Sequence, residues 1–395
     1  MGSRCKYLSA VLVLLASTAQ GFQQDSVSFK IHNHYVSPRA LGMGNAFVAV
    51  ADDYSGLFYN PAGLARRENH EINMSIEGGV TASFFSFAKD IEEAQNLPNA
   101  TENQKQQAIM EVIEDQYGST FGFRLAPATG IWVAPNWGVG VIPLDLSVEL
   151  TPRQKVGPAI DATVIADTTV ALGYGREVNW IPNSRTSVGI LGKFVNRGFA
   201  SKSILAIEAA TDPNLISKDD LYEGFTVDAD IGILYTPELP GDGWFWKMMK
   251  LARPTFGAVI RNVGEFGFGQ SMGLLGDNSV GEPERIYRVI DIGTRWEYPD
   301  FWIFGGRGVM DFKNILHPKH DFRKGLHLGF EFDWTMFSWW KGQYRVGLNQ
   351  GYLTLGASAL LGVFNLDLVT YGEEVGAGDQ LQENRVYMFR ANLNF

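Results

Sequence analysis

The chain of 395 residues has little cysteine, little histidine and, after its first residues, no long apolar run. Its one cysteine, Cys5, precedes the apolar run of the first segment instead of following it, so we expect no disulfide, lipid-modified cysteine or thiol chemistry. No later run is long enough for a membrane-spanning helix. The formal net charge of −10 argues against nucleic acid as a partner.

The signatures of common enzymes are also absent. The sequence contains no G-x-S-x-G, no H-E-x-x-H, no phosphate-binding glycine loop after a strand and no C-x-x-C. His32 and His34 share one side of an extended arm, but two further zinc ligands are not apparent. A Ser/His hydrolase stays open as an alternative, because triads are recognised by geometry and not by spacing. We predict no enzymatic activity, no metal site and no cofactor.

Residues 1–21 predict a secretory signal peptide. Arg4 and Lys6 precede an apolar run over residues 8–16, and Ala19-Gln20-Gly21 is a small-x-small cleavage site. An exported chain without membrane helices is either soluble in the periplasm or a closed barrel in the outer membrane. The pattern of alternation decides between these two.

Strict alternation of apolar and polar residues recurs along the chain and predicts strands with one apolar and one wet face. The clearest case is residues 325–334, where Phe330 and Phe332 face one way and His327, Glu331 and Asp333 the other. The segments are 70–88, 121–134, 139–150, 159–177, 186–200, 225–236, 254–264, 284–298, 302–315, 325–334, 344–349, 352–360, 364–371 and 385–395.

About fourteen strands, an even number, predict an all-β fold: a transmembrane antiparallel β-barrel in the bacterial outer membrane, with the outer-membrane lipid around it. A soluble sandwich also alternates, but it seldom has so many long strands with aromatics on the apolar face. The long polar stretches follow odd-numbered strands and the short turns follow even-numbered ones. Tryptophans gather near the even-to-odd connections, as expected of an aromatic girdle at one membrane surface.

Two connections depart from simple loops. Residues 89–117 are polar, with Ile109, Val112 and Ile113 at helical spacing, and predict a helical extracellular insertion whose apolar residues are candidates for a ligand groove. Residues 237–253 form a long connection on the turn side. This stretch contains Trp244 and Lys247 and suits a segment at the level of the lipid headgroups.

The segment 37–67 is rich in glycine and alanine and is interrupted by Pro38 and Pro61, so it fits neither a strand nor a long helix. It resembles the N-terminal hatch of the FadL-like outer-membrane long-chain fatty-acid transporter family. That hatch has an arginine, a Gly-x-Gly-x-Ala-Phe turn, an Ala-Asp-Asp run and an Asn-Pro-Ala-Gly-Leu motif in this order. The matching hatch or gating residues here are Arg39, Gly42, Gly44, Asp52, Asp53, Asn60, Pro61 and Ala62.

The resemblance implies a division into signal peptide (1–21), arm and lumenal hatch, or plug (22–69), and barrel (70–395). It also implies uptake of long-chain fatty acids or other hydrophobic compounds, gated by the hatch, with lateral exit through the barrel wall. The residue set Asn60-Pro61-Ala62 would lodge in the lumen, with Arg39, Asp52 and Asp53 tied to interior charges.

The C-terminal part is similar to a neighbouring branch of the same superfamily. The strand end Arg261-Asn262-Val263-Gly264 and the turn 371–374 resemble PorV-like and TraF-like proteins, which serve secretion or conjugation systems. The alternative function is therefore a non-transporting interaction barrel that docks an envelope protein partner through its loops. The terminal Phe395 resembles the signal by which the barrel-assembly machinery recognises its substrates.

Overall fold

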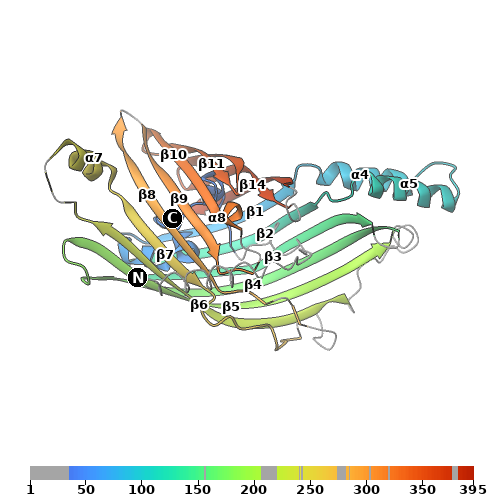
Figure 1. Cartoon of the computed structure of the whole chain (residues 1–395), viewed down its shortest axis with the longest axis horizontal. Coiled ribbons are helices and arrows are strands. Elements are labelled where there is room, and N and C mark those ends of the chain that lie inside the picture. The colour runs from blue at the N-terminus through green and yellow to red at the C-terminus, as the bar shows by residue number, and fades with distance from the viewer. Residues whose placement is uncertain are drawn as a thin grey trace, which may run out of the picture.

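The computed structural model is a closed barrel of fourteen antiparallel strands (Figure 1). It describes residues 35–154, 157–205, 220–239, 241, 243–273, 282–283, 285–301, 304–318, 321–375 and 381–395. The predicted signal peptide, most of the predicted arm, and His32, His34 and His320 lie outside these residues. None of the described helices is long and apolar enough to cross a membrane.

Each strand is hydrogen-bonded to its neighbours in sequence, and the barrel closes where β1 pairs with β14. The strands are β1 (Glu71–Thr81), β2 (Phe121–Ala134), β3 (Trp137–Gln154), β4 (Pro158–Val178), β5 (Ser184–Leu205), β6 (Tyr222–Pro237), β7 (Thr255–Arg261), β8 (Val289–Phe301), β9 (Phe304–Ile315), β10 (Leu326–Phe337), β11 (Trp340–Asn349), β12 (Tyr352–Leu361), β13 (Phe364–Glu374) and β14 (Glu383–Asn394).

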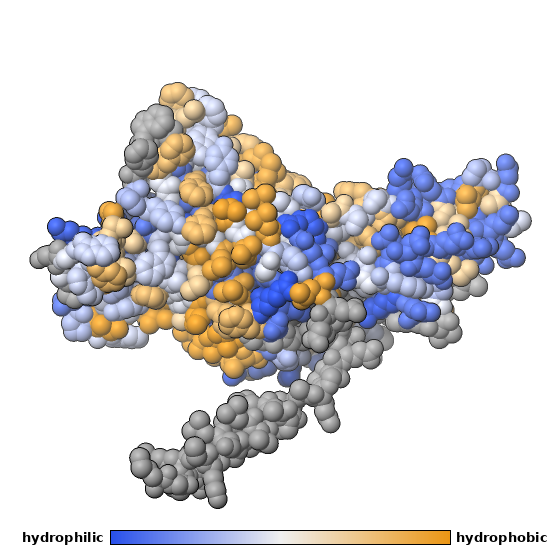
Figure 2. Space-filling view, turned by 45° about the horizontal axis from the view of Figure 1, so that its top comes forward, coloured by the Kyte–Doolittle hydropathy of each residue, from blue (hydrophilic) through white to orange (hydrophobic). Residues whose placement is uncertain are grey.

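Alternation along the strands sorts side chains between the two faces of the wall. On β10, Phe330 and Phe332 are exposed on the outside, whereas His327 and Glu331 are buried inside. Apolar residues gather in a band across the middle of the face shown in Figure 2. A closed barrel satisfies every backbone hydrogen bond within the wall, so it can present this apolar surface to lipid. This architecture is that of an outer-membrane barrel.

Most of the long connections lie at one end of the barrel. Helices α4 (Phe84–Gln95) and α5 (Glu102–Glu114) join β1 to β2 and project from the end at which odd-numbered strands finish (Figure 1). Thr101 caps α5 through a capping box with Gln104. Helix α7 (Trp244–Ala252) lies at the opposite, even-strand end, and α8 (Phe322–Gly325) precedes β10. We call these the odd end and the even end.

The boundaries of β1 and α4 differ from the expected ones. Alternation predicts a strand up to residue 88, but β1 ends at Thr81 and α4 begins at Phe84, ahead of residue 89. Phe87 and Ala94 are buried at helical spacing against Phe121, and this packing favours the helix over continued strand. The helical insertion is therefore longer than the polar composition alone indicates.

Residues 35–67, here called the lumen segment, are packed against the inner face of the wall. The segment contains α2 (Pro38–Gly42), α3 (Gly56–Tyr59) and the 3₁₀ helix η2 (Pro61–Arg66). Phe47, Leu57 and Leu64 are fully buried, in one cluster with wall residues such as Ile131 and Leu191. This cluster is the principal apolar core of the protein.

Terminal Phe395 lies at the seam that closes the barrel. Its backbone N–H donates to the carbonyl of Ile72, and the N–H of Ile72 donates to its carbonyl, both at 3.0 Å. The aromatic ring is on the exposed side of the wall. The role of this residue in barrel assembly stays a prediction.

Candidate functional site

An ion-pair network ties the lumen segment to strands β9–β11. The guanidinium of Arg39 donates from Nε and Nη2 to the two carboxylate oxygens of Glu331, at 2.8 and 2.7 Å. Its Nη1 donates to Asp52 and to Asp53, both at 2.8 Å. Glu331 has a side-chain exposure of 0% and also accepts from Arg345 Nε at 2.9 Å. Bidentate, charge-assisted bonds of this kind are the strongest that side chains make.

Arg307 joins the same network from β9. Its guanidinium pairs with Asp52, and its Nε lies 3.3 Å from Glu331 Oε1. Removal from water raises the pKa of Asp52, but the Arg39 and Arg307 guanidiniums lower it by more, so the pKa lies well below its usual range. A carboxyl with a lowered folded-state pKa stabilises the fold above its unfolded pKa of about 3.9, and this contribution is lost as the pH falls below that value.

Two glycines let the segment approach the wall closely. A Cβ at Gly42 would lie 3.1 Å from the Cβ of Arg345 and 3.2 Å from the Cα of Gly356. Gly44 has a φ of +66°, and a Cβ there would lie 2.3 Å from the carbonyl oxygen of Leu328. A side chain at either position would push the segment off the wall.

Asn60 fixes the turn between α3 and η2. Its side-chain oxygen accepts from the N–H of Ala62 at 3.1 Å, and its amide donates to the carbonyls of Val48 at 2.8 Å and Ile233 at 3.2 Å. Pro61 begins η2, where the missing N–H costs nothing. Since Ile233 is on β6, this one side chain links two parts of the lumen segment to the wall.

Replacing Asn60 with alanine is expected to loosen the lumen segment without unfolding the barrel. The change leaves buried carbonyls and one N–H without partners, at a cost of about 1–3 kcal/mol for each buried group. Amide hydrogen exchange over residues 46–63 should speed up at least tenfold. The variant N60D keeps the acceptor for Ala62 but loses both donated bonds, so it should loosen the same residues. Unchanged exchange in both variants would contradict this role.

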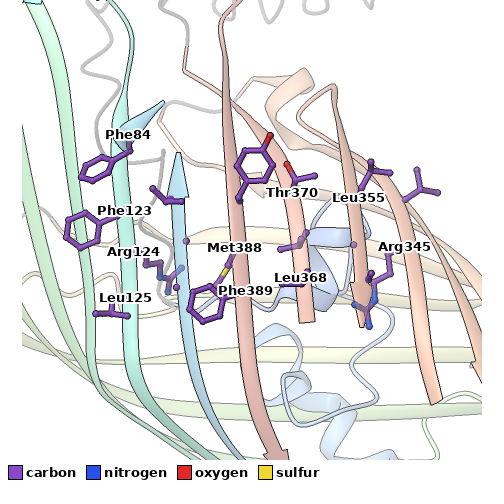
Figure 3. Close-up of a pocket in the computed structure, with 18 of the residues that line it drawn as sticks. Phe84, Phe123, Arg124, Leu125, Arg345, Leu355, Leu368, Thr370, Met388 and Phe389 are labelled. Atoms are coloured by element: carbon purple, nitrogen blue, oxygen red, sulfur yellow. The ribbon is translucent and has the colours of Figure 1, made fainter. Parts of the chain in front are cut away.

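A cavity of about 1150 Å³ lies on the outer face of the wall, between the start of α4 and strands β10–β14, β1 and β2 (Figure 3). Its outward position follows from Leu355, Leu368 and Phe389, which are about half exposed, whereas Arg390, next to Phe389 on β14, is buried on the inner face. Gly78 leaves space for the Phe389 ring on one side of the cavity, since a Cβ at position 78 would lie 2.8 Å from that ring. The outward-facing apolar side chains that line the cavity are Val80, Phe84, Phe85, Phe123, Leu125, Phe332, Tyr344, Val346, Leu355, Leu368, Tyr387 and Phe389.

The cavity and the lumen segment lie on opposite faces of the same strands. Val36 and Leu41 pack on the inner face against Val369 and Met388. The residues next in sequence, Leu368 and Phe389, face the cavity. Only the thickness of the sheet separates the apolar cavity from the segment held by Arg39.

The structure thus brings Arg39, Asp52 and Asp53 together and places Gly42, Gly44 and Asn60 at contacts with the wall. It does not bring the predicted groove residues to the cavity. Ile109 and Ile113 are fully buried between α4, α5 and the wall, with Val112 packed against them, and form the core of the insertion. Sequence reasoning missed Phe84 and Phe85, which do line the cavity.

Within the described residues, no group of three or more histidine, cysteine, aspartate or glutamate side chains could hold a metal ion.

No protein-family model and no curated protein matches the sequence. Among solved structures, the barrel is similar to the toluene transporter TbuX of Ralstonia pickettii, at 8% identity and a TM-score of 0.41, over 91% of this chain and 98% of that one. The toluene transporter TodX of Pseudomonas putida gives 9% and 0.41, over 92% and 98%. A FadL homologue of Pseudomonas aeruginosa gives 10% and 0.33, over 92% and 99%. Likeness at this distance carries no argument about function, which rests on the chain's own geometry.

Proposed function

We propose that this protein is an outer-membrane channel for the uptake of hydrophobic compounds, long-chain fatty acids among them, in which the lumen segment acts as a hatch. The observation that carries the proposal is the apolar cavity on the lipid-facing wall, directly behind the strands that hold α2. Its volume of about 1150 Å³ is slightly above the usual range for small-molecule sites, which is about 300–1,000 Å³.

The physical logic is a route that stays out of water. The inner face of the wall carries buried ion pairs, such as Arg124 with Asp145 and Arg197 with Asp167, and an apolar molecule gains nothing by remaining among them. A side exit through the wall would deliver it to the apolar cavity and then to the lipid. Movement of α2 away from β12 and β13 would remove the packing that supports the wall from inside.

Uptake of a labelled long-chain fatty acid tests this function. Cells that lack their own transporter would express either this chain or a variant with Asn60-Pro61-Ala62 deleted, at equal levels in the outer membrane. Uptake by the intact chain that is lost in the deletion supports hatch-gated transport. A correctly assembled barrel that takes up neither the fatty acid nor an aromatic hydrocarbon contradicts the proposed function.

One observation favours the alternative of an interaction barrel. The α4–α5 hairpin projects from the odd end with its own small core and bears the exposed Leu97 (Figure 1). Such a hairpin suits the docking of an envelope protein. Replacing residues 96–114 by a short loop while keeping Phe84 and Phe85 separates the two functions, because uptake should persist and binding of a partner should not.

A further inference from the structure

Helix α7 has an apolar face that no described part of the barrel covers. It spans nine residues, and none of them is buried. Trp244 is 78% exposed, and Phe245, Met248 and Leu251 are each about half exposed or more. Exposed tryptophan and phenylalanine in one short helix are costly in water and call for an apolar neighbour.

The two lysines of α7 lie together in one narrow polar strip along the helix. At 100° per residue, Lys247 and Lys250 are neighbours between Leu251 and Trp246, and the rest of the helix surface is apolar, with Trp244, Met248 and Leu251 on one face. Lys250 Nζ donates to the carbonyl of Gly241 at 2.8 Å, which sets the helix against its own connection. The arrangement is that of a helix that lies in the plane of a membrane surface.

The place of α7 in the fold agrees with this arrangement. It follows β6, packs beside β8 and stands at the even end of the barrel (Figure 1). Trp137, Trp180 and Trp339 are exposed at the same end, on or next to the connections between even and odd strands. Indole rings concentrate where lipid headgroups meet the acyl chains. The apolar face of α7 therefore lies at the same end of the barrel as these exposed indole rings.

We propose that α7 is a membrane-interface anchor that inserts its aromatic face into the leaflet at the even end and binds anionic phospholipid through Lys247 and Lys250. The charge of the protein makes this local site distinctive, because the chain as a whole is acidic. A basic side chain near an anionic lipid surface strengthens binding by about fivefold. This inference does not depend on the proposed transport function.

The experiment uses the mature chain reconstituted in lipid vesicles. Cys5 lies in the predicted signal peptide, so a single cysteine at position 248 (M248C) can carry the environment-sensitive fluorophore NBD. The matched control is Q107C on α5, which is exposed at the odd end. NBD at position 248 should emit at the shorter wavelength typical of lipid, and NBD at 107 at the wavelength typical of water. Water-like emission from both positions overturns the proposal.

Lipid preference is measured with spin-labelled phosphatidylglycerol and phosphatidylcholine as quenchers at equal mole fraction. Phosphatidylglycerol should quench the probe at 248 more strongly, and K247Q/K250Q should remove this difference while the emission stays lipid-like. Heat-dependent migration on gels checks that each variant forms the barrel. If the double variant does not assemble, raising the salt concentration with the unaltered lysines should weaken the preference in the same way. Equal quenching by the two lipids at low salt overturns the proposal.

Discussion

Replacing Arg39 with alanine is expected to release the lumen segment from the wall and raise the ion conductance of the barrel. Glu331 is buried on the wall, and Arg39 donates both of the hydrogen bonds that it receives from the lumen segment. Arg39 also forms ion pairs with Asp52 and Asp53. Removing one partner from a buried ion pair costs about 3 kcal/mol or more. The fraction of time the segment spends released should therefore rise by about a hundredfold.

Two measurements follow the release. Single-channel recording in planar bilayers should show larger and noisier conductance. Trypsin should cleave the variant after Arg66 and Arg67. In the unaltered protein the Arg66 side chain donates to the wall and the Arg67 side chain donates to Glu71. The control is Arg185→Ala, which removes an exposed pair with Glu177 at the even end and should change neither readout. A closed, trypsin-resistant R39A protein would show that the network does not hold the segment.

Replacing Leu355 with glutamine is expected to weaken binding of a hydrophobic ligand about tenfold or more. Leu355 lines the outer cavity, and contact between a leucine side chain and an apolar ligand contributes about 1.5–3 kcal/mol when it is fully buried. Glutamine also leaves an amide without partners in an apolar site. Titration of a fluorescent fatty acid against the purified barrel measures the change.

The chain offers a matched control on the same strand. Leu353 also faces outward on β12, with an exposure of 49% against 48% for Leu355, but it is not among the residues that line the cavity. L353Q therefore carries the same cost of a polar residue on the lipid-facing wall and should bind the ligand normally. Equal loss of affinity in the two variants would mean that the effect comes from the membrane surface and not from the cavity.

The fold could be predicted from the sequence because each strand carries its own evidence. The alternation of Phe330 and Phe332 with Glu331 fixes both the strand and the side that faces lipid, and fourteen such segments give the closed barrel of fourteen strands. Boundaries were less predictable. The sequence predicts a strand over residues 284–298, yet β8 begins at Val289, since its neighbour β7 ends at Arg261 and offers no further partner.

The candidate site was predictable only in part. The motif from Arg39 to Ala62 marked the lumen segment, and the alternation marked Glu331 as facing inward. The pairing of Arg39 with Glu331 could not be foreseen, because 292 residues separate them and the register of the barrel decides the contact. The cavity could not be predicted either, because the register of the barrel also decides which residues line it. Val80 and Tyr387 line it together only because β1 pairs with β14 at the seam.

The most direct test of the account is photo-crosslinking of the purified barrel with a long-chain fatty acid that carries a diazirine, followed by peptide mapping. The account predicts labels on the cavity-facing residues of β1, β13 and β14, such as Leu368 and Phe389, and at Phe84. Unlabelled fatty acid should compete for these labels, and L355Q should reduce them while L353Q does not. Labels spread evenly over the outward faces of all fourteen strands, without competition, would contradict it.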